Sequence, residues 1–185
     1  AIRRIGQRDT HGFPVVICRP GIVIGKGCPP AHWGVGMFSS ETRMQFWGDG
    51  RNRLPLVLVE DVANALVLAL DAPGIEGQSF LLTDEPLLSG RDYVEAVSAA
   101  CGTRIRAVAA PAWTSYAGDL LKEAAKHLIS HPNRKIPSYR DWDSRSHRAH
   151  YDSSKTRDVL GWKPAGTREA LIERGIAEAV RDFMR

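Results

Sequence analysis

The sequence predicts an α/β fold, and two observations carry that prediction. Short apolar runs rich in β-branched residues recur along the chain, and between them lie segments whose apolar residues follow a helical period. Capping residues precede several of the helical segments, and glycines follow several of them. Strands that alternate with helices are typical of α/β proteins.

The first third of the chain predicts strands around a glycine-rich loop. Residues 13–18 form a buried run of the kind found in parallel strands that are covered on both faces. Residues 21–43 carry so many glycines and prolines that we expect a loop around a site rather than long regular elements. A second strand pair is predicted at 44–47 and 56–59, with Gly48-Asp49-Gly50 as a turn signal between them.

A helix is predicted next. Its apolar face is defined by residues at helical spacing, namely Val62, Ala65, Leu66, Ala69 and Leu70. We expect Asp61 to cap the start of this helix and Pro73-Gly74 to end it.

The middle of the chain continues the alternation. Residues 78–83 predict a strand. Ser89 and Asp92 have the spacing of a capping box, so a helix should begin there, and Gly102 should end it. Residues 104–109 predict one more strand.

The last third is predicted to be mainly helical. A long helix is expected over 112–130, followed by a polar, basic surface loop over 131–150. Asp152 should cap a short helix that Gly161 ends. A final amphipathic helix should begin after Thr167 and run nearly to the end of the chain.

The composition excludes several functional classes. The 185 residues are 43% hydrophobic and 25% charged, and a net charge of +4 is far from the dense basic patterns of dedicated nucleic-acid-binding proteins. Three cysteines without paired spacing favour a reducing compartment, the cytoplasm, over a disulfide framework. The most apolar stretch, residues 62–70, is shorter than the ~20 residues of a membrane span. We therefore expect neither nucleic acid nor a membrane as a partner.

Two segments are similar to known functional motifs, but neither fits its motif in both spacing and structural context. The segment from Gly21 to Gly27 is similar to a phosphate-binding loop, but its spacing is one residue short and prolines follow where a helix should start. A glycine loop that lets the backbone approach a ligand or a neighbouring element is the better interpretation. Tyr151 and Lys155 match a catalytic Tyr-x3-Lys spacing, yet a cap at Asp152 leaves Tyr151 outside the helix.

The segment 131–150 leaves an alternative open. Its arginines, lysines and aromatic residues could bind an anionic partner, although a plain surface loop is the favoured interpretation. His127 and His131 have a spacing that zinc sites use, but a solvated face accounts for them, so we expect no metal site. A serine hydrolase is not indicated, because the sequence lacks G-x-S-x-G.

Three motifs occur in order along the chain. They are Ile17-Cys-Arg-Pro-Gly-Ile-Val-Ile-Gly25, then Gly48-Asp-Gly50 leading to Val59-Glu-Asp-Val-Ala-Asn-Ala65, then Asp152-Ser-Ser-Lys155 leading to Leu160-Gly-Trp-Lys-Pro164. Together they resemble the C-terminal half of the extended short-chain dehydrogenase/reductases, the NAD-dependent epimerase/dehydratase family. The resemblance implies the C-terminal part of a Rossmann-like doubly wound fold plus a small mixed α/β substrate-binding cap.

The resemblance also implies positions for the ligands. In that family the segment after the Arg-Pro strand lies beside the nicotinamide ring, so Pro20, Gly21 and Val23 are expected to contact NAD or NADP. The glycine-rich stretch through Phe38 is expected to line the substrate cleft. The region 112–150 is expected to belong to the substrate-binding cap.

Two departures from the family pattern bear on the substrate. Leu54 stands where members that act on nucleotide sugars commonly have an arginine, with Arg51 and Arg53 displaced from it. The family's Arg-Pro-Gly-Asp is replaced by Trp142-Asp-Ser-Arg145. We keep Arg51, Arg53 and Arg145 as substrate-binding candidates, but the loss of paired phosphate contacts argues against a typical nucleotide-diphosphate sugar. A non-nucleotide carbonyl or alcohol substrate is favoured, and an unusually arranged sugar-nucleotide site stays open.

The family's glycine-rich cofactor motif and catalytic Tyr-x3-Lys precede the Arg-Pro strand. The resemblance therefore implies a portion of a longer NAD(P)-dependent oxidoreductase, epimerase or dehydratase that transfers hydride at a substrate C–O centre. We expect no catalytic residue in this chain and no turnover by it alone. Residues 1–60 should be the last part of the Rossmann-like domain with the cleft loop, and residues 61–185 the Rossmann-packing helix, strand and cap. A small-molecule substrate and a homodimer fit the resemblance, and a non-catalytic module that binds an anionic partner is the alternative.

Overall fold

The structure, a computed structural model, describes residues 15–85, 88–129, 132–133, 135–147 and 149–185. They form two compact units. The first unit comprises Pro55–Leu88, His150–Arg185 and the described residues up to Pro30; the second comprises Ala31–Leu54 and Ser89–Ala149. Each unit is built from segments that are distant in sequence.

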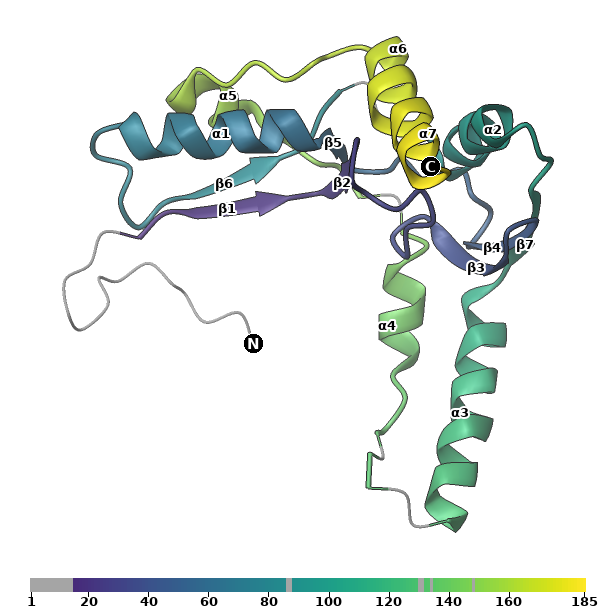
Figure 1. The fold of residues 1–185 in the computed structure, drawn as a ribbon. Coiled ribbons are helices and arrows are strands. Elements are labelled where there is room, and N and C mark those ends of the chain that lie inside the picture. Colours follow the sequence, from purple (N-terminus) through teal and green to yellow (C-terminus); the bar gives the residue numbers. More distant parts are fainter. Residues whose placement is uncertain (1–14, 86–87, 130–131, 134, 148) are drawn as a thin grey trace. The chain divides into compact units, whose positions relative to one another are not determined.

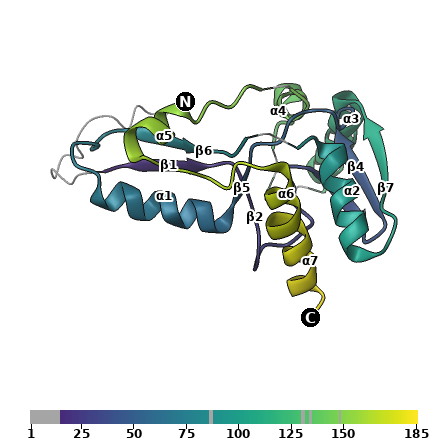
Figure 2. The ribbon, with the colours of Figure 1, turned by 90° about the horizontal axis from the view of Figure 1, so that it is seen from above.

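The first unit contains two pairs of parallel strands with helices beside them. Its elements are β1 (Ile17–Pro20), β2 (Ile22–Ile24), β5 (Leu56–Leu58), α1 (Val59–Asp71), β6 (Ser79–Leu82), α5 (Ser154–Leu160), α6 (Arg168–Ala170), η1 (Leu171–Ala177) and α7 (Glu178–Phe183). β1 pairs with β6 and β2 pairs with β5, both in parallel. α1 runs along β1 and β6 in both views (Figures 1 and 2). The parallel pairing expected for the first strand is thus confirmed, although its predicted start at residues 13–14 lies outside the described residues.

The core of the first unit is centred on Trp162, which is 1% exposed. It packs in a cluster of buried apolar side chains with Val57, Ala65, Ile75, Phe80, Leu82 and Leu160. The Trp162 indole N–H donates to the Asp61 carbonyl oxygen at 2.9 Å. Asp61 Oδ2 accepts a hydrogen bond from the backbone N–H of Ala165 at 2.9 Å. Because α1 begins at Val59, the predicted cap at Asp61 is wrong, and this residue instead fastens the segment after α5 to the first turn of α1.

The predicted apolar face of α1 is only partly buried. Ala65 is fully buried, and Val62 and Ala69 pack against the same core. Leu66 is 47% exposed and Leu70 is 86% exposed, so their assignment to the buried face is wrong. At 100° per residue these two side chains lie on the flank of the stripe, and the β1–β6 pair covers only its centre.

The last helical segment of the first unit begins as predicted. Thr167 caps it, and its hydroxyl accepts a hydrogen bond from the backbone N–H of Ala170 at 3.1 Å. The middle of the segment, η1, is a π-helix that contains the buried Gly175. A Cβ at Gly175 would collide with the Ile24 side chain, so glycine allows the helix to pack closely against β2.

The second unit is a three-stranded sheet with helices. Its elements are β3 (Gly36–Ser40), β4 (Arg43–Trp47), α2 (Gly90–Cys101), β7 (Arg106–Ala110), α3 (Ala112–Leu128) and α4 (Tyr139–Ser144). β4 lies between β3, which is antiparallel to it, and β7, which is parallel to it. The predicted pairing of residues 44–47 with 56–59 is wrong, because β4 and β5 belong to different units. β2 and β3 lie inside the glycine-rich segment where a loop was expected.

The segment 131–150 is not entirely a loop, because it contains α4. α4 lies beside α3 (Figure 1), where the Trp142 indole N–H donates to Asp119 Oδ2 at 2.9 Å. The Tyr116 and Tyr139 rings meet edge to face at 5.6 Å between centroids. Of the basic or histidine residues singled out in this segment, His131, Arg134 and Arg148 lie outside the described residues. Among the described residues, no helix is long and apolar enough to cross a membrane.

The capping box of α2 is confirmed. Ser89 Oγ accepts from the Asp92 backbone N–H at 3.2 Å, and Asp92 Oδ2 accepts from the Ser89 backbone N–H at 2.8 Å. Gly102 ends the helix in the left-handed conformation, with φ 64°. Both ends of α2 are therefore determined by local sequence.

Replacing Ser89 with alanine should lower the free energy of unfolding by about 1 kcal/mol, because the backbone N–H of Asp92 loses its acceptor. Urea denaturation followed by far-ultraviolet circular dichroism measures this change. Ser89→Asn is the matched control and should retain most of the stability, because asparagine is an equally good cap. Equal losses in both variants would contradict the cap assignment.

Candidate functional site

The junction between β1 and β2 contains the three residues expected to contact the cofactor. The chain changes its partner strand here: the Gly21 N–H donates to Leu82 O at 3.0 Å, and the Ile22 N–H donates to Pro55 O at 2.7 Å. A Cβ at Gly21 would collide with the Pro55 carbonyl oxygen. Glycine is therefore required for the close approach of the two backbones, independent of any ligand. Pro20 precedes this point as the exposed last residue of β1.

Val23 presents backbone groups on an open strand edge. Successive residues of a strand direct their N–H and C=O groups to opposite sides, and the Ile22 N–H is directed to β5. The N–H and C=O of Val23 are therefore directed away from β5. In the described part of the chain, no strand pairs with β2 on that side. The Val23 side chain packs against the core, which holds this edge in place.

In the second unit, Arg145 lies within a cluster of three tryptophan rings. Its guanidinium carbon is 4.3 Å from the centroid of Trp142, 5.1 Å from that of Trp47 and 5.4 Å from that of Trp33. The Trp33 and Trp47 rings are themselves in edge contact at 4.9 Å. Cation–π attraction stabilises a guanidinium in such a position. We call these four residues the tryptophan–arginine cluster.

The hydrogen bonds of this cluster leave a buried nitrogen of Arg145 without an acceptor among the described residues. The Trp47 indole N–H donates to the Trp33 carbonyl oxygen at 2.6 Å, and the Trp142 indole N–H donates to Asp119. Arg145 Nη1 is buried and has no hydrogen-bond partner among the described residues. A buried donor without an acceptor costs about 1–3 kcal/mol, and more when the group is charged. The geometry therefore suits an anionic or carbonyl ligand at Arg145.

A cavity of about 730 Å³ adjoins the cluster and lies between α3, α4 and the segment that joins them. Arg145 and Trp142 line it together with Lys122, Lys126 and Glu123. Glu123 is 8% exposed and accepts hydrogen bonds from Lys126 Nζ at 2.5 Å and from the backbone N–H of Lys135 at 2.9 Å. These bonds, that of Lys126 foremost, hold the pKa of the Glu123 carboxyl below its ordinary value.

The Glu123 contacts should therefore make this region sensitive to acid. The pKa of the Glu123 carboxyl in the folded state lies below its unfolded value near 4.5. The contacts of the ionised carboxylate therefore stabilise the fold above pH 4.5, and this stabilisation is lost as the pH falls through the folded-state pKa. An NMR titration of the Glu123 carboxyl carbon measures this pKa. We expect Lys126→Met to move it up toward the ordinary value, and Lys122→Met to move it less. Identical titrations in wild type and Lys126→Met would contradict the assignment.

The other substrate candidates lie elsewhere in the second unit. Phe38 is half-buried on β3, opposite Met44 of β4. Arg51 and Arg53 are exposed on the segment after the Gly48-Asp49-Gly50 turn, and the Arg53 backbone forms an isolated bridge with Ser89.

The sequence interpretation found Arg145 but missed two of its ring partners, Trp33 and Trp47. Trp142 was predicted only as part of the segment Trp142-Asp-Ser-Arg145, and not as a ring that contacts the Arg145 guanidinium. A signal was present: alternation along β4 places Trp47 and Gln45 on one face, and Trp33 stands in the adjoining glycine-rich segment. The contact with Trp33 depends on tertiary structure, because a glycine-rich segment has no periodicity that fixes the direction of a side chain.

Tyr151 and Lys155 do not form a catalytic pair on one helix face. α5 begins at Ser154, so Tyr151 lies outside it. Ser153 occupies the N-cap position, one residue after the predicted cap, and Asp152 Oδ1 accepts from the Ser154 N–H at 2.8 Å. The Lys155 ammonium lies 5.1 Å from the centroid of the Phe80 ring on β6.

Comparison with known proteins gives matches among solved structures. No protein-family model and no curated protein matches the chain. UDP-glucuronic acid 4-epimerase from Bacillus cereus, in complex with UDP-glucuronic acid and NAD, is 15% identical with a TM-score of 0.59, over 92% of this chain and 46% of that one. RMD from Pseudomonas aeruginosa, complexed with NADPH, is 17% identical with a TM-score of 0.58, over 94% and 49%. UDP-glucose 4-epimerase from Thermotoga maritima, with UDP-glucose, is 18% identical with a TM-score of 0.59, over 95% and 47%.

Two of these neighbours are 4-epimerases, and the third, RMD, is complexed with NADPH. This chain has the fold of their C-terminal portion. It spans about half the length of the epimerase structures that it matches. The epimerase-type fold confirms the α/β class and the fold implied by the three sequence motifs. Matched structures contain NAD or NADPH, the two cofactors that the motifs implied.

Proposed function

We propose that this chain is the substrate-binding C-terminal portion of an NAD(P)-dependent oxidoreductase, epimerase or dehydratase. The observation that carries the proposal is the β1–β2 junction. At Pro20 and Gly21 the chain passes from pairing with β6 to pairing with β5. Val23 then offers a backbone N–H and C=O on an open strand edge. A nicotinamide carboxamide has one acceptor and one donor group, which complement those of Val23. When bound, the cofactor supplies or accepts hydride at its nicotinamide ring.

The other residues at the junction fit this role. The Gly21 and Ile22 N–H groups already donate to Leu82 and Pro55, so they hold the backbone rather than bind a ligand. Pro20 has no N–H, its φ is fixed by the ring, and the residue is exposed. These residues support orientation of the ring, while proton transfer would belong to residues that precede this chain.

For the substrate, we infer that Arg145 binds an anionic or carbonyl oxygen. Its unpartnered Nη1 and the rings of Trp33, Trp47 and Trp142 support this role. Three tryptophan rings surround the Arg145 guanidinium. Leu54, which stands where members acting on nucleotide sugars commonly have an arginine, has no charge with which to bind a phosphate. The arrangement favours a flat, non-nucleotide alcohol or carbonyl compound over a nucleotide-diphosphate sugar. We further propose that the enzyme acts in the cytoplasm.

The test uses the longer polypeptide that contains the preceding Rossmann half. We expect it to bind NAD(P)H, and to change absorbance at 340 nm with non-nucleotide alcohols or carbonyl compounds. UDP-glucose is followed instead by chromatography of the sugar nucleotide, because epimerisation regenerates the cofactor, and we expect no conversion. Arg145→Met should raise KM by about tenfold, the effect of losing one charged hydrogen bond, while Arg140→Met on the exposed face of α4 should not. Turnover of UDP-glucose would contradict the substrate assignment, and turnover by the 185-residue chain alone would contradict its role as a portion.

A further inference from the structure

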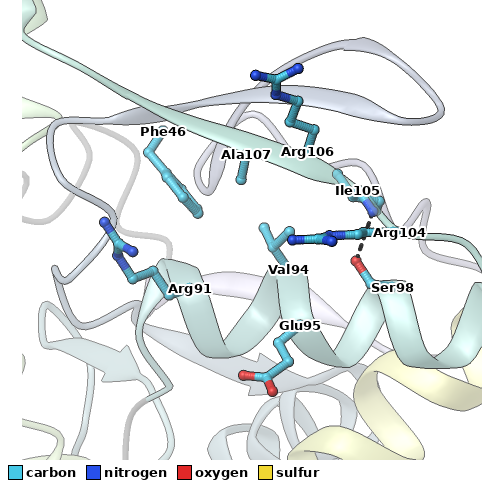
Figure 3. Close-up of a pocket in the computed structure, with 9 residues that line it drawn as sticks. All are labelled: Phe46, Arg91, Val94, Glu95, Ser98, Arg104, Ile105, Arg106 and Ala107. Carbon is cyan, nitrogen blue, oxygen red and sulfur yellow. Dashed lines mark hydrogen bonds between the residues drawn. The ribbon is translucent and has the colours of Figure 1, made fainter.

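A cavity of about 960 Å³ lies in the second unit, between α2 and the strands β4 and β7 (Figure 3). Phe46 of β4 lines it. The neighbouring residues of β4, Gln45 and Trp47, are directed to the other face of the sheet, because side chains alternate along a strand. On that face Gln45 donates to Ser115, and Trp47 contacts Arg145. The cavity is therefore separate from the tryptophan–arginine cluster.

One wall of this cavity is apolar and held in place. Phe46 and Val94 are both 4% exposed, and Ile105 and Ala107 continue the surface. A Cβ at Gly50 would lie 2.7 Å from the Phe46 ring, so the backbone packs directly against the ring. Binding cavities for small molecules have such an apolar lining with a few polar groups, and their volumes fall in the same range.

Three arginines line this cavity, and two of them, Arg91 and Arg104, lie beside the apolar wall. In Figure 3 the Arg91 and Arg104 side chains extend over α2 beside Phe46 and Val94, whereas Glu95 is directed away. Arg91 Nε donates to the Asp49 carbonyl oxygen at 3.0 Å. The Arg104 guanidinium has neither an ion pair nor a hydrogen bond within the described residues. Unneutralised guanidinium groups beside an apolar wall attract a carboxylate or a phosphate.

The backbone holds Arg104 in position. Gly102 ends α2 in the left-handed conformation, and the Thr103 N–H donates to the Ser98 carbonyl oxygen at 3.2 Å. The Ile105 N–H then donates to the Ser98 hydroxyl oxygen, also at 3.2 Å. The residues on both sides of Arg104 are thus fixed to α2, which reduces the entropy that binding would cost.

The helix terminus itself does not supply the binding groups. The first backbone N–H groups of α2 donate to Asn52, Gly50 and Ser89. An anion would therefore be held by the side chains of Arg91 and Arg104.

We propose that this cavity binds an organic anion, with its carboxylate or phosphate on Arg91 and Arg104 and its apolar ring against Phe46 and Val94. The site does not depend on the proposed enzymatic function, because it lies on the opposite face of the sheet from Arg145.

The experiment titrates the 185-residue chain with phenyl phosphate, benzoate, inorganic phosphate and benzyl alcohol, and follows ring and methyl signals by NMR. We expect phenyl phosphate or benzoate to shift the signals of Phe46 and Val94. The compound that binds more tightly shows whether the site prefers a phosphate or a carboxylate. Arg104→Gln should weaken binding by about tenfold, the effect of losing one charged hydrogen bond. Arg140→Gln, outside the cavity, should leave binding unchanged.

Three results would overturn the proposal. Inorganic phosphate that binds as tightly as phenyl phosphate would remove the role of the apolar wall. Benzyl alcohol that binds as tightly as benzoate would remove the role of the arginines. Equal affinity of wild type and Arg104→Gln, with the variant's spectrum showing a folded chain, would exclude Arg104 from the site.

Discussion

Gly21→Ala should destabilise the first unit by about 3 kcal/mol or more, because the new Cβ collides with a backbone atom rather than a flexible side chain. That atom, the Pro55 carbonyl oxygen, also accepts the hydrogen bond of Ile22. Relief of the collision must therefore separate β2 from β5. The loss is measured as a lower urea midpoint by circular dichroism.

The control for this variant is Gly118→Ala. Gly118 lies on α3, where a Cβ meets no atom within 4 Å. Alanine is the better helix former by about 1 kcal/mol, so this variant should be as stable as wild type or more stable. A Gly21→Ala chain with the wild-type midpoint would show that the two backbones do not approach as described.

Trp162→Ala should cost about 3–5 kcal/mol, the largest single loss expected in the core. The side chain is 1% exposed, and its removal leaves a cavity among Val57, Phe80 and Leu160. The bond to the Asp61 carbonyl oxygen is lost as well. Chemical denaturation measures the change in the free energy of unfolding.

Two further variants separate these contributions. Trp162→Phe keeps a ring but loses the indole N–H, so it should cost clearly less than alanine. Phe183→Ala removes a large aromatic side chain that is 71% exposed in the same unit, and should change stability by about 0.5 kcal/mol or less. Similar losses at Trp162 and Phe183 would contradict the position of the core.

Local signals in the sequence predicted the elements whose ends they determine. The Ser89–Asp92 capping box, Gly102 and Thr167 gave correct helix boundaries, because caps act within one turn. Pairing of strands could not be predicted in this way. β4 and β5 flank a good turn signal, yet they pair with other strands because the chain passes from one unit to the other between them.

The proposed site residues show the same contrast between local and distant signals. Pro20, Gly21 and Val23 are close in sequence, so a single motif could propose them together as cofactor contacts, which stays a prediction. The partners of Arg145 come from three separated segments, and two of them, Trp33 and Trp47, were found only from the structure.

The most direct measurement is an NMR titration of the ¹⁵N-labelled chain with reduced nicotinamide mononucleotide and, separately, with AMP. The proposed function predicts that the nicotinamide compound shifts the backbone amide of Val23 and its neighbours, and that AMP leaves them unchanged, because the adenine end would contact residues outside this portion. Shifts confined to residues 131–150 with both compounds would contradict the proposal and favour a non-catalytic module that binds anions.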